Sequence, residues 1–214
     1  MNDSVKISQM GQVRPSSEDV ADVWLCLPVR PNEDSDAKKL QDVSILCCKI
    51  WNLAIKNIPG LQTKDKINYR NIGPAIKTFK KHDISFSRPV AVVFQKVADQ
   101  LKNEHRAYYH SKVAKPPQSK DEEVFFEQTY PRGAFEFIDD TMLLLSYGTS
   151  NEKINPLRES WIHLRLPEEI SLPRLDLIKR VVISEMVPNK NARKKNGRIQ
   201  RCIYAKLVWY KKLG

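Results

Sequence analysis

The sequence contains no long apolar run and no leader-like start. No stretch approaches the roughly 18 consecutive apolar residues of a membrane-spanning helix. The first 22 residues are polar and mixed in charge, without the apolar centre of a signal peptide. The sequence therefore predicts a soluble, cytoplasmic protein with no membrane partner.

Metal-binding motifs are also missing. The four cysteines, Cys26, Cys47, Cys48 and Cys202, form no Cys-x-x-Cys pair, and no histidine stands at zinc-finger spacing from them. We expect no metal and no other cofactor. An enzyme with a cysteine or histidine nucleophile is an alternative for which the chain offers only scattered candidates.

Acidic residues are scarce toward the C-terminal end. From Lys179 to Lys212 there are eleven lysines or arginines and one acid, Glu185, so this segment carries +10 of a total net charge of +11. Concentrated positive charge favours a polyanionic partner, because neutralising phosphates releases their counterions. The alternative is a solvated basic face that maintains solubility.

The two adjacent cysteines lie in the segment SILCCKIWNLAIKN, residues 44–57. Apolar side chains recur there at three- and four-residue steps, which is typical of a helix with one buried face: Leu40, Val43, Cys47, Ile50 and Ala54. Cys47 falls on that face and Cys48 beside it. Packing explains the pair, and redox chemistry is the alternative, for which no neighbouring base is evident.

The period of the pattern then changes along the chain. A strand at 23–30 precedes three helices, which begin near Asp34, Asn71 and Ser87. The later segments are short and rich in β-branched or aromatic residues, as strands are: 125–139, 141–148, 160–166, 177–187 and 199–210. The predicted class is α+β, a mostly antiparallel β-barrel with an inserted three-helix lobe.

The same pattern predicts the domain boundaries. Residues 1–22 are expected to form a flexible tail, and residues 113–123, VAKPPQSKDEE, a proline-containing polar linker. The helical lobe covers 33–112. The barrel combines 23–32 with 124–214.

Several motifs in this order resemble the N-terminal half of TnpB, the transposon-encoded RNA-guided nuclease family related to type V CRISPR effectors. The similar segments are VWLCLPVRPNEDSDAKKLQ, CCKIWNLAI, NYRNIGPAIKTFKK, FQKVADQLKNEHRAYYHS and YPRGAFEFIDDTMLLL. The resemblance covers residues 23–210. In one departure, KPPQSKDEE replaces a basic, aromatic segment that commonly follows the third helix of the family.

The resemblance implies a wedge-like barrel and a recognition lobe that bind a guide RNA and a short flanking motif on double-stranded target DNA. In the family a RuvC nuclease domain follows the strand that resembles CIYAKLVWY, whereas four residues follow it here. We therefore expect a binding-only, nuclease-inactive module, which acts as a repressor or with a separate nuclease or effector subunit, or with a second copy of itself.

The resemblance also implies nucleic-acid-binding residues. Tyr69 and Gln95 match positions where the family's recognition helices approach DNA, and a glutamine amide can pair with adenine. The basic segment 188–201 is predicted to be a hairpin that clamps the phosphates of the RNA. The complete set is Tyr69, Arg70, Gln95, Lys96, Arg106, Tyr130, Arg132, Lys190, Arg193, Lys194, Lys195, Arg198 and Arg201.

A second function remains open at this stage. The helices could pack as a helix-turn-helix variant in which Gln95, Lys96 and Arg106 face DNA. Such a protein would be a guide-independent DNA-binding regulator, or an accessory subunit that works through protein contacts. It would bind specific duplex DNA without RNA.

Overall fold

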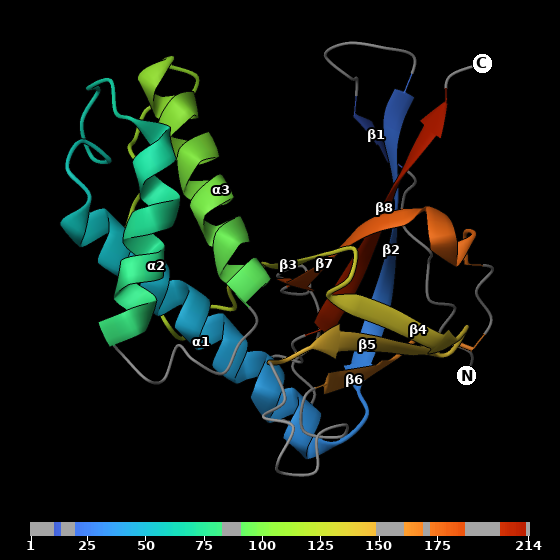
Figure 1. Cartoon of the computed structure of the whole chain (residues 1–214). Coiled ribbons are helices and arrows are strands. Elements are labelled where there is room, and N and C mark those ends of the chain that lie inside the picture. Colours follow the sequence, from blue (N-terminus) through green and yellow to red (C-terminus); the bar gives the residue numbers. More distant parts are fainter. Residues whose placement is uncertain are drawn as a thin grey trace, which may run out of the picture. The chain divides into compact units, whose positions relative to one another are not determined.

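A computed structural model describes residues 11–13, 20–82, 91–148, 161–168, 172–186 and 202–212. Within these ranges the helices are α1 (Asp34–Asn57), α2 (Ile72–His82) and α3 (Ala91–Tyr109), with short 3-10 turns η1 (Tyr69–Asn71) and η3 (Leu175–Leu177). The strands are β1 (Gly11–Val13), β2 (Val20–Pro31), β3 (Gln128–Pro131), β4 (Phe135–Asp139), β5 (Met142–Ser146), β6 (Trp161–Arg165), β7 (Ile178–Met186) and β8 (Cys202–Lys212). The predicted α+β class is confirmed (Figure 1).

The chain divides into two compact units. The sheet unit comprises Met1–Asp36, Thr129–Leu145 and His163–Gly214, and the helical unit comprises Ala37–Gln128 and Ser146–Ile162. Two strand segments fall inside residues 1–22, the stretch predicted to be a tail: β1 and the first residues of β2.

The strands form one sheet in the order β3-β7-β8-β2-β6-β5-β4, and β1 also pairs with β2. As the sequence predicted, the N-terminal strand joins the later strands: β2 is antiparallel to β8 from Val20 opposite Lys212 to Val29 opposite Ile203. The helices are thus inserted between strands of a common sheet. None of the helices within the described ranges is long and apolar enough to cross a membrane.

The predicted barrel is wrong for the part of the chain that the structure describes. A barrel requires every strand to pair along both edges, but β3 and β4 lie at the two ends of the strand order and are not neighbours. The strands also differ in length: β2 has 12 residues and β4 has 5. β2 pairs with β6 at Arg30 and Pro31, which joins the strands β6, β5 and β4 to the rest of the sheet.

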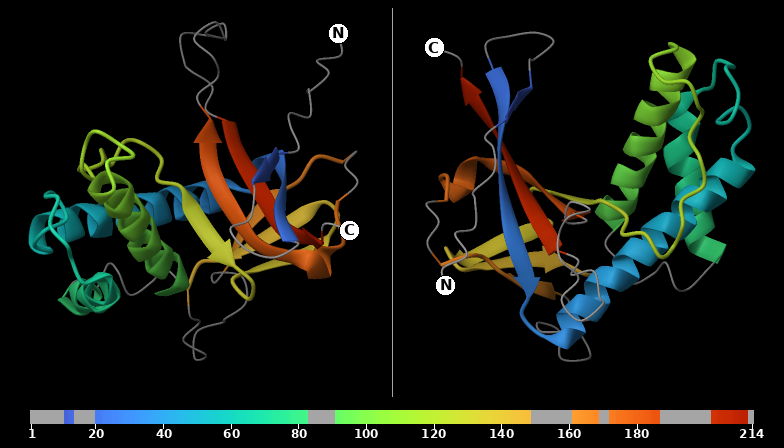
Figure 2. Two further views of the ribbon diagram at one scale, coloured as in Figure 1. Left: turned by 90° about the horizontal axis from the view of Figure 1, so that it is seen from above. Right: turned by 180° about the vertical axis from the view of Figure 1, so that it is seen from behind.

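The helical unit is built around the apolar face predicted for the first helix. Leu40, Val43, Cys47, Ile50 and Ala54 are all at most 1% exposed. α2 and α3 contact each other and lie side by side (Figure 2). Acidic residues in the first turn of α1, Asp34 and Asp36, are favourable at the positive end of the helix dipole.

Both adjacent cysteines are packed as the sequence predicted. Cys47 and Cys48 are 0% exposed, and no disulfide joins them. Burial raises the pKa of each thiol, so neither is a ready thiolate. Cys48 Sγ lies 3.2 Å from the carbonyl oxygen of Lys120 and donates a weak hydrogen bond to it.

The predicted polar linker lies along α1 and is bound to it. The indole N–H of Trp51 donates to the carbonyl of Gln118 at 2.8 Å. The side-chain amide of Asn52 makes two hydrogen bonds to the backbone of Lys120. It accepts from the backbone N–H and donates to the carbonyl, both at 2.8 Å. Further along, the Ser44 hydroxyl accepts from the N–H of Phe126 at 2.7 Å. We call residues 116–128 the strap.

Candidate nucleic-acid interface

The predicted site residues are divided among three places. Lys190, Arg193, Lys194, Lys195, Arg198 and Arg201 lie outside the described residues. Tyr130 and Arg132 belong to the sheet unit. The helical unit holds Tyr69, Arg70, Gln95, Lys96 and Arg106.

A buried histidine anchors the loop between α1 and α2. His105 on α3 is 0% exposed, and its Nε2 lies 3.0 Å from the carbonyl oxygen of Gly60 and 3.2 Å from that of Thr63. Because carbonyl oxygens only accept, the ring proton must be on Nε2. Nδ1 is bonded to the hydroxyl of Tyr69 at 2.9 Å. One imidazole therefore fixes three points of the loop.

Gly60 permits the tight turn that brings the loop to this histidine. Its φ of +85° is a conformation that other residues rarely adopt, and a Cβ there would collide with the side chain of Ile67. The loop thus has both a special backbone position and a buried anchor.

Cations and aromatic rings gather around the anchored loop. The Arg106 guanidinium lies 4.7 Å from the centre of the Tyr69 ring, and Lys64 Nζ lies 5.4 Å from that of Tyr108. Tyr109 stacks at 6.4 Å on His105 and remains 37% exposed. We call the following residues the α3-end surface: Lys64, Tyr69, Arg106, Tyr108, Tyr109 and His110. Its geometry suits an anionic ligand with flat rings.

Gln95 lies on the same face of α3 as Arg106 but farther toward its start. Eleven residues separate them, which is about 16 Å along a helix and close to three whole turns. Gln95 is exposed and its amide lies near Gly73 of α2. Lys96 forms an ion pair of 3.2 Å with Asp99, so its charge is partly neutralised. The structure places these two residues on α3 without bringing them to the α3-end surface.

The remaining described candidates differ in exposure. Arg70 follows Tyr69 and is exposed. Tyr130 is 0% exposed, so its ring offers no face to a ligand. Arg132 is exposed, and its backbone N–H donates to the carbonyl of Lys179 at 2.9 Å, which ties the end of β3 to β7.

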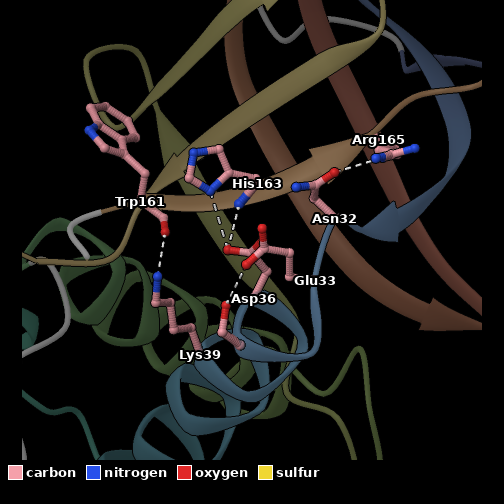
Figure 3. A network of polar contacts seen from close by, with 8 residues as sticks. Asn32, Glu33, Asp36, Lys39, Trp161, His163 and Arg165 are labelled. Carbon is pink, nitrogen blue, oxygen red and sulfur yellow. Dashed lines mark hydrogen bonds and ion pairs between the residues drawn. The ribbon is translucent and has the colours of Figure 1, made fainter. Parts of the chain in front are cut away.

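A pairing of carboxylate and imidazole occurs elsewhere in the sheet unit (Figure 3). The carboxylate of Asp36, 2% exposed, accepts the backbone N–H of His163 at 3.1 Å and lies 3.3 Å from its Nδ1. In the same unit Arg165 Nε donates to the side chain of Asn32 at 2.7 Å. These bonds fix the start of α1 and account for the buried carboxylate. Within the ranges that the structure covers, no three His, Cys, Asp or Glu side chains are grouped to hold a metal.

The sequence prediction missed a set of aromatic and basic residues on the sheet. Trp24, Lys179, Arg180, Lys206 and Tyr210 lie on β2, β7 and β8. A signal was available in β8, because alternation in a strand puts Tyr204, Lys206 and Tyr210 on one face.

No protein-family model matches the chain, and no curated protein sequence matches it. The resemblance to TnpB therefore depends on the sequence motifs quoted above.

Proposed function

We propose that this protein is an RNA-guided nucleic-acid recognition module of the TnpB kind. It binds a structured guide RNA and a short flanking motif on double-stranded target DNA. It recognises without cutting, and works with a separate nuclease or effector chain or as a binding-only repressor. The observation that carries the proposal is the α3-end surface.

Three physical features of that surface support nucleic acid as its ligand. Arg106 and Lys64 can neutralise phosphates, and the half-exposed ring of Tyr109 can stack on a base. Two acids of α3 lie one or two turns from the surface and are both paired: Asp99 with Lys96 and Lys102 at 3.2 and 3.4 Å, and Glu104 with Lys120 at 3.5 Å. The loop is held by His105, so less conformational freedom is lost on binding.

The charge of the surface can be tested with a double variant. We expect Lys64→Ala/Arg106→Ala to lower the slope of log K against log salt by about 0.7 to 0.9 per removed cation, with a similar effect on different sequences. The measurement is titration of a structured RNA and of a duplex DNA at several salt concentrations.

A matched control removes two charges elsewhere in the same unit. Lys38 and Lys49 are exposed on α1, and Lys38→Ala/Lys49→Ala has the same net charge as the test variant. An equal change of slope in the control would mean that only total charge matters, and the α3-end surface would lose its assignment.

Dependence on a guide separates the proposal from a guide-independent DNA-binding regulator. The exposed amide of Gln95, on the same helical face as Arg106, is the feature that favours the regulator. We expect the protein purified from its own cells to carry RNA, seen as a high ratio of absorbance at 260 nm to that at 280 nm. Specific duplex binding that survives nuclease removal of this RNA would support the regulator instead.

A further inference from the structure

The three strands β2, β8 and β7 have two different faces. Residues directly opposite each other in antiparallel strands point to the same side. The register therefore assigns Leu27, Ala205 and Ile183 to one face, and all three are 0% exposed. By the same register the other face carries Trp24, Tyr204, Lys206, Tyr210 and Arg180. Lys179 stands at the register shift before Arg180 and reaches the Tyr210 ring, and we call these six residues the platform.

Cations cover the aromatic rings of the platform. Lys206 Nζ lies 4.6 Å from the centre of the Trp24 ring, and Lys179 Nζ lies 5.9 Å from that of Tyr210. Arg180 forms an ion pair of 3.1 Å with Asp22. The platform thus has three cations near one acid, and its net charge is positive.

Packing of the sheet does not account for these side chains. On the same face, Val208 opposite Trp24 is 3% exposed and Val182 opposite Lys206 is 9% exposed, so the apolar side chains among the platform residues are already covered. Tyr210 nevertheless remains 54% exposed. It gains little from burial, and its ring is accessible to a flat partner.

Trp24 and Tyr210 are spaced for two neighbouring ligand rings. Tyr210 is opposite Asp22 and Val208 is opposite Trp24, so the two aromatic residues are diagonal neighbours across β2 and β8. Diagonal neighbours in antiparallel strands are about 7 to 8 Å apart. An extended strand can place consecutive bases at such a distance, whereas a duplex keeps its bases stacked on each other.

We infer that the platform binds an unpaired nucleic-acid strand, with bases stacked on Trp24 and Tyr210 and phosphates bound by Lys179, Arg180 and Lys206. An exposed cation–π contact is weaker than the stacking of a base on an aromatic ring. A base can therefore replace each lysine on its ring, and the released ammonium is left beside the phosphate of the same nucleotide. The platform would be a second nucleic-acid-binding surface in addition to the one in the proposed function, and it shares no residue with the α3-end surface.

The test uses 12-nucleotide oligo(dT), oligo(rU) and an abasic oligomer of the same length, titrated by fluorescence anisotropy. Tyr210→Ala should weaken binding of oligo(dT) and oligo(rU) about tenfold and leave binding of the abasic oligomer unchanged. Trp24→Leu should act likewise, and Trp24→Phe should retain most of the affinity. Comparison of the dT and rU arms shows whether DNA or RNA is preferred.

Controls distinguish this inference from the proposed function. Tyr109→Ala alters an exposed tyrosine of the α3-end surface. If Tyr109→Ala weakened binding of the oligomers and Tyr210→Ala did not, the platform would be overturned and the proposed function would stand. An equal loss on the abasic oligomer would exclude stacking. If duplex DNA bound as tightly as oligo(dT), and Tyr210→Ala abolished that binding too, selection of an unpaired strand would be excluded. Tyr210 is largely exposed, so its variant should remain folded even if Trp24→Leu does not.

Discussion

Trp51→Ala should lower the free energy of unfolding by about 4 kcal/mol, the range found when a large buried aromatic side chain is truncated. Trp51 is 0% exposed, and its ring packs edge-on against Phe126 at 5.7 Å between centroids. Lys120 Nζ lies 3.9 Å from the centre of the Trp51 ring, and the indole N–H of Trp51 donates a hydrogen bond to the carbonyl of Gln118. The substitution therefore opens a cavity in the core and also releases the strap from α1. Urea denaturation measures the first effect.

A second variant separates packing from hydrogen bonding. Trp51→Phe keeps an aromatic ring but loses the indole N–H, so we expect a cost of about 1 to 2 kcal/mol. Proteolysis of residues 116–128 should increase in both variants and most strongly in Trp51→Ala. Equal stability losses in the two variants would contradict a packing role for the ring.

His105→Ala should cost about 3 kcal/mol of stability, because it empties a buried site and leaves three hydrogen-bonding groups without their partner. Those groups are the carbonyls of Gly60 and Thr63 and the hydroxyl of Tyr69. Arg106 rests on the Tyr69 ring, so the variant should also weaken nucleic-acid binding at the α3-end surface. Thermal unfolding and the RNA titration described above measure the two effects.

Two milder variants show which bonds matter. Tyr69→Phe removes only the hydroxyl, and we expect a cost of about 1 kcal/mol. His105→Gln keeps an N–H donor for the loop carbonyls and should recover part of the stability lost in His105→Ala. If His105→Gln were as unstable as His105→Ala while Tyr69→Phe cost nothing, the histidine would act through its volume and not by anchoring the loop.

Periodic patterns predicted the parts of this fold that depend on burial. The stripe containing Cys47 and Ile50 is the buried face of α1, and the N-terminal strand joins β8, since both depend on apolar side chains at regular spacing. The strap was not predictable in this way. Its polar sequence suggested a solvated linker, but its backbone groups are bound by Trp51 and Asn52, which are distant in sequence.

Site prediction from sequence was limited by similar causes. Residue type alone could not distinguish the buried ring of Tyr130 from the half-exposed ring of Tyr109. The role of His105 depends on carbonyl groups of a loop more than forty positions away, which no local pattern reveals. The closed barrel was inferred from strand content and resemblance, but closure requires the two end strands of the sheet to pair, and β3 and β4 are not neighbours in the strand order.

The pairing of β2 with β8 has a consequence for the order of folding. The helical unit draws most of its residues from one continuous stretch, Ala37–Gln128, so its contacts can form while the chain is still being synthesised. β2 is synthesised before that stretch and β8 long after it, so β2 cannot pair with β8 until the chain is almost complete. Closing so long a loop is entropically unfavourable and slow. During that interval β2 presents an unpaired edge toward the position of β8, and this edge is open to strand pairing with another molecule.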